Sequence, residues 1–161
     1  MSDEPLVEVL RVLGRLGIPY MLTGSYASNL YGRLRSTFDA DLVVAIKPTG
    51  MKALVCALAK GFYFDAESLE EARESGGHFN AIHKDSGFKV DFYLLSGDEY
   101  GRAVFRRRRR EKVFGLRISV ISPEDLILAK LRWSAESGSQ RQIEDARGVA
   151  ELQEGRLDLS Y

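Results

Sequence analysis

The stretch LTGSYASNLYGRLRSTFDADL, residues 22–42, combines a small-residue turn, a short helical segment and two closely spaced carboxylates. The apolar residues just before the turn predict a short buried strand over residues 20–23. Gly24 and Ser25 then open a helix of about residues 25–33. A glycine there lets an anion approach the backbone closely, and the first N–H groups of a helix attract negative charge. The turn is therefore a candidate anion-binding site.

Asp39 and Asp41 stand two residues apart in the next predicted strand, residues 38–46. Successive side chains of a strand point to opposite faces, so these two carboxylates share one face. Both stay ionised side by side only when a cation lies between them or water solvates them well. Carboxylate oxygens suit Mg²⁺, which is held by one or two carboxylates together with substrate phosphates. The pair alone is a weak pattern, and a solvated strand edge is the alternative reading.

A third carboxylate, Asp91, lies in the middle of the predicted strand 88–95. Its neighbours Val90 and Phe92 point to the opposite face and are expected to pack in the core. A carboxylate in such a strand is costly unless it is paired or bound to a metal. Together with the earlier pair, Asp91 completes a set of three candidate metal ligands and catalytic residues.

The remaining pattern predicts one domain, residues 1–161, of α/β (α+β) class, with a mixed or mostly antiparallel sheet flanked by helices. Further helices are expected over residues 4–16, 50–60, 67–74, 101–110, 122–135 and 140–152. A further strand is expected over residues 78–83, and a last strand or hairpin over residues 112–121. Residues 48–50 are expected to form a loop. Residues 122–125, Ser-Pro-Glu-Asp, have the composition of a helix start and open a C-terminal helical segment of about residues 122–155.

The order of these motifs resembles the nucleotidyltransferase superfamily with the DNA polymerase β-like fold. The hallmark of that superfamily is a Gly-Ser or Gly-Gly turn, a helix, often an Arg-x-Thr, then Asp-x-Asp, and later a third Asp in another strand. Residues 35–37, Arg-Ser-Thr, and residues 39–41, Asp-Ala-Asp, fit this pattern. Residues 121–131, followed by Arg141 and Asp145, are similar to the C-terminal segment of small bacterial or archaeal members. Abortive-infection and toxin–antitoxin proteins belong to that group.

The resemblance implies that Gly24 and Ser25 bind the phosphates of an NTP such as ATP. It also implies that Asp39, Asp41 and Asp91 hold one or two Mg²⁺ ions, for which Mn²⁺ can substitute. Further candidate nucleotide-binding residues are Arg35, Thr37 and Lys130. For Arg35 and Thr37 the alternative is a solvated loop position, and for Lys130 it is a surface lysine whose stem covers apolar neighbours.

The implied reaction is transfer of an NMP from the NTP to a hydroxyl acceptor, either RNA such as tRNA or a protein. A toxin–antitoxin role with an antitoxin-like partner is part of the same expectation. Two alternatives stay open. One is a catalytically silent protein of this fold that binds a nucleotide or a partner, and the other is an enzyme that modifies a small molecule such as an antibiotic.

Five consecutive arginines, residues 106–110, form the strongest local charge in a chain whose basic and acidic residues both number 23. Such a block meets phosphate readily, so docking of a polyanion such as tRNA stays open. The favoured interpretation is a solvated helix end, partly paired with Glu99, Glu111 or acidic residues elsewhere. His78 and His83 are expected on opposite faces of one strand, which argues against a shared metal.

The remaining composition is that of an ordinary soluble protein. The single cysteine, Cys56, excludes an intrachain disulfide, and its apolar helical surroundings predict a buried thiol. The acidic start lacks the features of a signal peptide, and no apolar run approaches the ~20 residues that cross a bilayer. These features predict a cytoplasmic protein without membrane contact.

Overall fold

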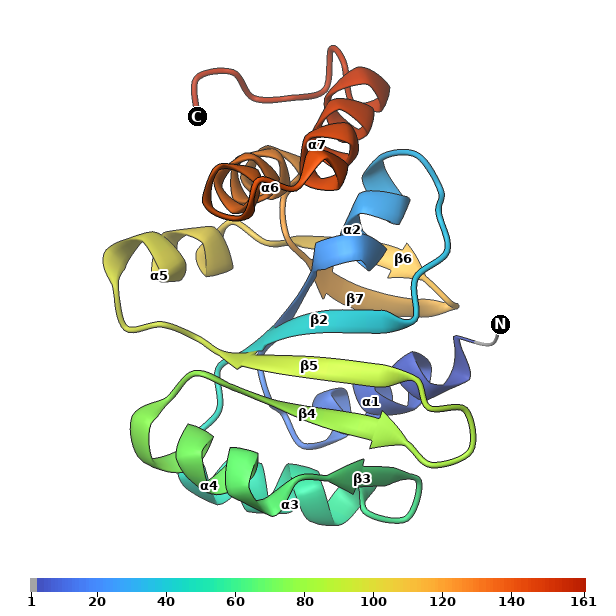
Figure 1. The fold of residues 1–161 in the computed structure, drawn as a ribbon, viewed down its shortest axis with the longest axis vertical. Coiled ribbons are helices and arrows are strands. Elements are labelled where there is room, and N and C mark those ends of the chain that lie inside the picture. The colour runs from blue at the N-terminus through green and yellow to red at the C-terminus, as the bar shows by residue number, and fades with distance from the viewer. Residues whose placement is uncertain (1–2) are drawn as a thin grey trace.

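The computed structural model describes residues 3–161 and, within them, one mixed sheet in the order β3-β4-β5-β2-β1-β7-β6 (Figure 1). The strands are β1 (Tyr20–Thr23), β2 (Asp39–Val44), β3 (Phe62–Phe64), β4 (His78–His83), β5 (Lys89–Leu94), β6 (Arg109–Val113) and β7 (Leu116–Val120). The helices are α1 (Glu4–Arg15), α2 (Gly24–Tyr31), α3 (Pro48–Leu58), α4 (Ala66–Ser75), α5 (Glu99–Arg106), α6 (Pro123–Ser137) and α7 (Gln140–Leu152). The predicted mixed α/β class with C-terminal helices is confirmed.

The centre of the sheet brings the two carboxylate-bearing strands together. β2 pairs antiparallel with β1 and parallel with β5. In this register Asp41 lies opposite Thr23 on one side and opposite Asp91 on the other. The strand of the third carboxylate is therefore the direct neighbour of the strand that carries the first two.

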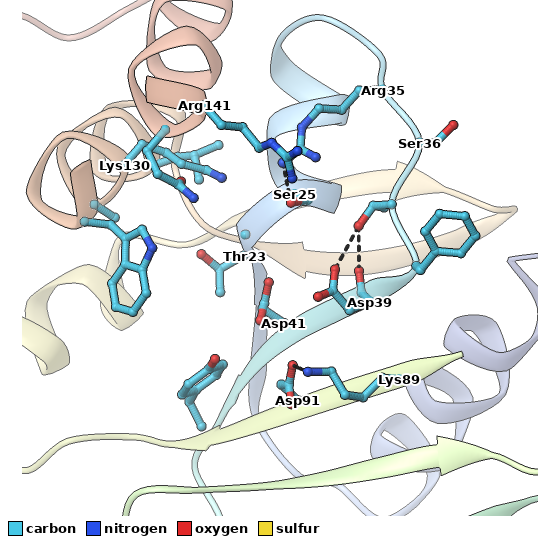
Figure 2. Close-up of a pocket in the computed structure, with 18 residues that line it drawn as sticks. Thr23, Ser25, Arg35, Ser36, Asp39, Asp41, Lys89, Asp91, Lys130 and Arg141 are labelled. Atoms are coloured by element: carbon cyan, nitrogen blue, oxygen red, sulfur yellow. Dashed lines mark hydrogen bonds and ion pairs between the residues drawn. The ribbon is translucent and has the colours of Figure 1, made fainter. Parts of the chain in front are cut away.

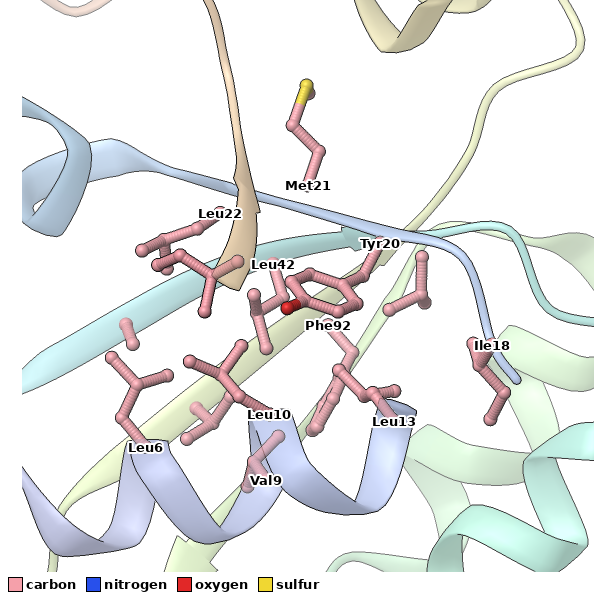
Figure 3. Packing of buried hydrophobic residues seen from close by; sticks show 14 of the residues in the cluster. Leu6, Val9, Leu10, Leu13, Ile18, Tyr20, Met21, Leu22, Leu42 and Phe92 are labelled. Carbon is pink, nitrogen blue, oxygen red and sulfur yellow. The ribbon is translucent and has the colours of Figure 1, made fainter. Parts of the chain in front are cut away.

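The two faces of these strands differ in chemistry. Ala40, Leu42 and Val44 of β2 are fully buried on one face, whereas Asp39 and Asp41 are half-buried on the other. The apolar side of α1 packs beneath β1, β2 and β5, as Figure 3 shows. The helices α2, α6 and α7 contact one another and lie toward the end of the molecule away from α3 and α4 (Figure 1). The core thus supports the strands from one side and leaves their carboxylates on the other.

The C-terminal helices form a hairpin whose ends follow local rules. Ser122 caps α6 by accepting a hydrogen bond from the Asp125 N–H at 3.1 Å, as its sequence predicted. Gly138 takes a left-handed conformation, φ 71°, and ends the helix. α7 begins two residues later, so the two helices pack closely against each other. In the part of the chain that the structure describes, no helix is long and apolar enough to span a membrane.

The helix predicted over residues 101–110 is wrong at both ends. α5 begins at Glu99, because Asp98 caps it by accepting from the Gly101 N–H at 2.7 Å. It ends at Arg106, and residues 109–113 instead form β6, which pairs antiparallel with β7. Arginine suits a helix intrinsically, but cross-strand pairing overrides that weak preference here.

Two smaller expectations also fail, and one short strand was not predicted. Residues 48–50 begin α3 rather than forming a loop, because Pro48 occupies the first turn, where its missing N–H costs nothing. The short strand β3 escaped prediction because its three residues are too few to show a period. Cys56 is exposed, since the buried side of α3 is made by Met51, Leu54 and Leu58.

Candidate active site

A pocket of about 710 Å³ opens on the carboxylate face of the central strands. Figure 2 shows Asp39, Asp41 and Asp91 on its sheet side, and basic side chains from other segments across from them. Every site residue predicted from the sequence lines this pocket: Gly24, Ser25, Arg35, Thr37, Asp39, Asp41, Asp91 and Lys130. The fold therefore brings together residues that are more than a hundred positions apart in the chain.

Gly24 stands where a side chain would be both strained and crowded. Its φ is +66°, and a Cβ built on it would lie 2.0 Å from Oδ2 of Asp41. Both the backbone conformation and the close carboxylate therefore require glycine. The helix α2 begins at this residue, so its free N–H groups start beside the carboxylates of the sheet.

The crowding of like charges is strongest at Asp41. Burial, and after it the neighbouring carboxylates of Asp39 and Asp91, raise the pKa of Asp41 to about 6. The cations of Lys130 and Lys89 act in the opposite direction with smaller effect. Carboxylates placed this way are ligands for a divalent cation, which would favour their ionised forms.

Asp91 is buried and paired. Its side chain is 8% exposed, and its Oδ2 lies 2.9 Å from Nζ of Lys89. Lys89 was not among the predicted site residues, although its place two residues before Asp91 on one strand face could have indicated it. Tyr93, two residues after Asp91, also lines the pocket. Burial first, and then the charge of Asp41, raise the pKa of Tyr93 to about 12.

Thr37 contacts Asp39 and not open solvent. Its buried hydroxyl lies 2.9 Å from Oδ1 and 3.0 Å from the carbonyl oxygen of Asp39. The alternative of a solvated loop threonine is therefore wrong. The contact fixes the orientation of the Asp39 carboxylate at the rim of the pocket.

The three carboxylates surround one space without meeting at a point. Among residues 3–161, no three His, Cys, Asp or Glu side chains converge closely enough to form a ready metal-binding group. In this structure the Asp39 carboxylate contacts Thr37 and the Asp91 carboxylate contacts Lys89. Asp39, Asp41 and Asp91 have the chemistry to hold Mg²⁺.

A basic cluster faces the carboxylates, built around a residue that was not predicted for the site. Asp145 of α7 accepts hydrogen bonds from Arg35 at 3.0 and 3.1 Å and from Lys130 at 2.9 Å. Arg35 also donates to Oγ of Ser25 at 2.7 Å. Lys130 is only 6% exposed, so the surface-lysine alternative is wrong, and Arg35 is no solvated loop arginine. Arg141 lines the same pocket (Figure 2).

The arginine run mostly binds its own chain. Arg107 pairs with the fully buried Asp125 at 2.8 Å, and Arg109 pairs with the buried Glu124 at 2.9 Å. Arg108 lies over the Phe105 ring, and Arg110 donates to Ser119. Four of its five residues are exposed and Arg106 ends α5, as the favoured interpretation expects. The acidic partners lie elsewhere in the chain, in the first turn of α6, and not at Glu99 or Glu111. The two candidate histidines contact Tyr93 and Phe62 through their rings, which agrees with a structural role.

Comparisons with known proteins agree on the fold. No protein-family model and no curated protein sequence matches the chain. Solved structures do match it. The lincosamide antibiotic adenylyltransferase LnuA aligns with a TM-score of 0.63 at 14% identity, over 92% of this chain and 98% of its own. The antibiotic-resistance factor ANT(2'')-Ia aligns with a TM-score of 0.65 at 16% identity, over 93% and 85%.

A third match is an antigenic nucleotidyltransferase-like protein from Paracoccidioides brasiliensis, with a TM-score of 0.62 at 21% identity, over 94% of this chain and 76% of that one. At these identities the likeness shows the fold. The chain has the fold of the nucleotidyltransferases, and the resemblance found in its sequence is confirmed at that level.

Proposed function

We propose that this protein is a Mg²⁺-dependent nucleotidyltransferase, which moves an NMP from an NTP to a hydroxyl acceptor. One observation carries the proposal: three carboxylates on the adjacent strands β2 and β5 share a pocket with the Gly-Ser start of α2. Opposite them lie the cations Arg35, Lys130 and Arg141. A triphosphate needs both a hard cation and basic donors, and this pocket offers ligands for the first and supplies the second.

Each residue has a role in this mechanism. The N–H groups at Gly24 and Ser25 bind the terminal phosphates, and Arg35 and Lys130 donate to the same oxygens. Asp39, Asp41 and Asp91 would hold Mg²⁺, and the ion would supply positive charge to the attacking and leaving oxygens of a displacement at the α-phosphate. Thr37 keeps the Asp39 carboxylate oriented.

The proton and bond changes balance without a further reactant. Asp91 lies in the strand beside Asp41 and accepts the proton of the acceptor hydroxyl. The acceptor oxygen bonds to the α-phosphorus while the bond from that phosphorus to the bridging oxygen of the β-phosphate breaks. Pyrophosphate leaves with that oxygen, and the cations of Arg35 and Lys130 stabilise its negative charge.

The acceptor we favour is RNA, such as tRNA, or a protein, in a toxin–antitoxin setting with an antitoxin-like partner. The charge of the pocket supports an acceptor that is not cationic. Its acidic residues are the three aspartates assigned to the metal, and its basic residues are Arg35, Lys89, Lys130 and Arg141.

The second candidate function is modification of a small antibiotic, because LnuA and ANT(2'')-Ia have the same fold. A polycationic drug needs acidic side chains beyond those that hold metal, and among the described residues this pocket has no others. An uncharged drug would not meet this objection. The candidate is therefore tested beside the first in one assay.

The test incubates the protein with Mg²⁺ and each α-³²P-labelled NTP, together with total RNA, cell lysate or representative lincosamides and aminoglycosides. We expect a labelled macromolecule, whose loss on treatment with ribonuclease or protease identifies its class. The double variant Asp39→Asn with Asp41→Asn should abolish the label. Asp85→Asn, which changes an exposed aspartate of the β4–β5 turn, is the matched control and should label normally.

Two other outcomes decide between the alternatives. Label on a drug alone would establish small-molecule modification. Bound NTP without label under any condition would support the catalytically silent protein. Equal labelling by the wild type and the double variant would exclude the proposed mechanism.

A further inference from the structure

The carboxylate of Asp145 binds two residues of the basic cluster, Arg35 and Lys130, and so connects three segments of the chain. It comes from α7, it binds Lys130 of α6, and it binds Arg35 of the segment that follows α2. Arg35 extends the network to Ser25, in the first turn of α2. One side chain near the end of the sequence is therefore connected to the Gly-Ser turn, 120 positions earlier.

We propose that Asp145 is a positioning residue for nucleotide binding, which holds Arg35 and Lys130 aimed at the triphosphate and, through Arg35, orients Ser25. This inference rests on the proposed function and adds to it a residue that needs no contact with the substrate. Asp145 itself is not among the residues that line the main pocket, whereas Arg35, Lys130 and Ser25 are.

The hydrogen-bond geometry shows whether Asp145 leaves Arg35 and Lys130 with free donors for a phosphate or occupies those donors itself. A carboxylate that used up the donors of both cations would compete with phosphate. Arg35 gives Asp145 its Nε–H and one N–H of Nη2, and gives Ser25 the other N–H of Nη2. The two N–H groups of Nη1 make no hydrogen bond within the described residues, and Lys130 spends one of its three donors. Both cations therefore keep donors for a ligand.

Burial makes the arrangement rigid. The side chains of Lys130 and Asp145 are 7% and 9% exposed, and that of Arg35 is 28% exposed. Burial by itself would raise the pKa of Asp145, but hydrogen bonds from Arg35 and Lys130 outweigh it and hold that pKa below its usual value. An ionised carboxylate between two cations fixes both of them, and removing it would leave two positive charges to repel each other.

The test measures binding and not transfer, so that it is independent of the acceptor. Trp133 is the only tryptophan of the chain and lines the pocket, so its fluorescence can report titration with Mg²⁺ and ATP. Asp145→Asn should raise the Kd about tenfold or more, the scale of one charge-assisted hydrogen bond. Asp145→Glu keeps the charge and should recover most of the affinity.

The matched control is Glu151→Gln. Like Asp145, Glu151 is a carboxylate of α7 that pairs with an arginine from the segment after α2. Its partner is Arg33, which does not line the main pocket. Glu151→Gln should leave the Kd unchanged. A second charge-removing variant, Asp145→Ala, adds helix propensity to α7, and circular dichroism shows which of the two variants is folded. Folded Asp145→Ala should also bind at least tenfold more weakly.

A double-mutant cycle tests whether Asp145 acts through Arg35. In an Arg35→Gln background, removal of the Asp145 carboxylate should weaken binding by a clearly smaller factor than in the wild type. Equal factors in the two backgrounds would overturn the proposal. An unchanged Kd for Asp145→Asn would also overturn it, because the carboxylate would then have no effect on binding, and a lower Kd would make Asp145 a competitor of the phosphates. Equal weakening by Asp145→Asn and Asp145→Glu would assign the loss to packing and overturn it as well. If the wild type binds no NTP, it is the proposed function that fails.

Discussion

At the scale of single residues, the candidate site stores unfavourable electrostatics. The Asp41 carboxylate lies against Gly24 and near the carboxylates of Asp39 and Asp91. In the absence of a cation this arrangement opposes folding, because the unfolded chain would let the three charges separate. Functional sites of this kind lower the stability of the fold, and the loss can be measured as a difference in the free energy of unfolding.

Asp41→Asn is therefore expected to stabilise the metal-free protein at pH 7.5. The pKa of Asp41 is raised in the folded state, so the folded protein holds its proton at pH values where the unfolded chain has lost it. The destabilisation by Asp41 is absent below about pH 4, develops between about pH 4 and 6, and is complete above that range. Urea unfolding in EDTA at pH 4 and at pH 7.5 measures the difference.

The control is Asp85→Asn, whose exposed side chain should give no gain at either pH. Saturating Mg²⁺ should narrow the difference between wild type and Asp41→Asn, since the ion would stabilise the carboxylate form. A variant that is less stable than the wild type at pH 7.5 without metal would show that charge crowding is not the dominant effect at Asp41.

At the scale of elements, the start of α6 organises the half of the molecule that carries Lys130. Ser122 caps the helix through the Asp125 N–H and also donates to the Asp125 carboxylate at 3.0 Å. Arg107, just after α5, and Arg109, the first residue of β6, then pair with acidic residues of the first turn of the helix. Glu124 and Asp125 in this turn stabilise the helix start through their negative charge, and they also form the ion pairs with the two arginines.

Ser122→Ala should cost about 1 kcal/mol of stability, the usual value for loss of an N-cap. For a chain of this length that corresponds to a fall in Tm of roughly 2–4 °C. Nucleotide affinity should stay the same, because Ser122 does not line the pocket. Differential scanning fluorimetry and the fluorescence titration measure the two properties.

Ser137→Ala is the matched control in the same helix. Ser137 is exposed, and its hydroxyl donates back to the Trp133 carbonyl and accepts a long hydrogen bond, 3.3 Å, from the Ser139 N–H; such local bonds contribute little to a helix. Its Tm should change by less than that of Ser122→Ala. An equal or larger fall for Ser137→Ala would show that the cap is not what stabilises α6.

At the scale of the whole molecule, the pocket is shared between the sheet and the C-terminal helices. Its lining comes from β1, α2, the segment between α2 and β2, and from β2, β5, α6 and α7. A ligand that bridges the carboxylates and the cations would connect these elements across the pocket. Binding should therefore appear as stabilisation of the entire fold.

Mg²⁺ with ATP at a hundred times its Kd should stabilise the protein by about 2.7 kcal/mol. This corresponds to a rise in Tm of roughly 5–10 °C for a chain of this length. The control is ATP with EDTA, which should give a smaller shift, and the Asp39→Asn, Asp41→Asn double variant should lose the dependence on Mg²⁺. Identical shifts with and without the metal would argue against the proposed role of the carboxylates.

Much of the candidate site could be predicted from the sequence, because its parts are defined locally. A glycine before a helix, alternation along a strand and a Ser-Pro-Glu-Asp helix start depend on neighbours within a few residues. Gly24, Asp39, Asp41 and Ser122 were placed correctly for this reason. The boundary between α5 and β6 was not, because a run of arginines has no apolar period to show where a helix gives way to a strand.

Only the tertiary structure decided which distant residues meet. It placed Asp91 opposite Asp41 through parallel pairing of β2 and β5, and it joined Arg35 and Lys130 to Asp145. It also gave the arginine run its partners at the start of α6. The sequence by itself determined most of the local elements, though not β3 or the boundary between α5 and β6, and the alternation that puts each carboxylate on one face of its strand. The strand order and the docking of α7 are set by packing between segments far apart in the chain, which no local pattern encodes.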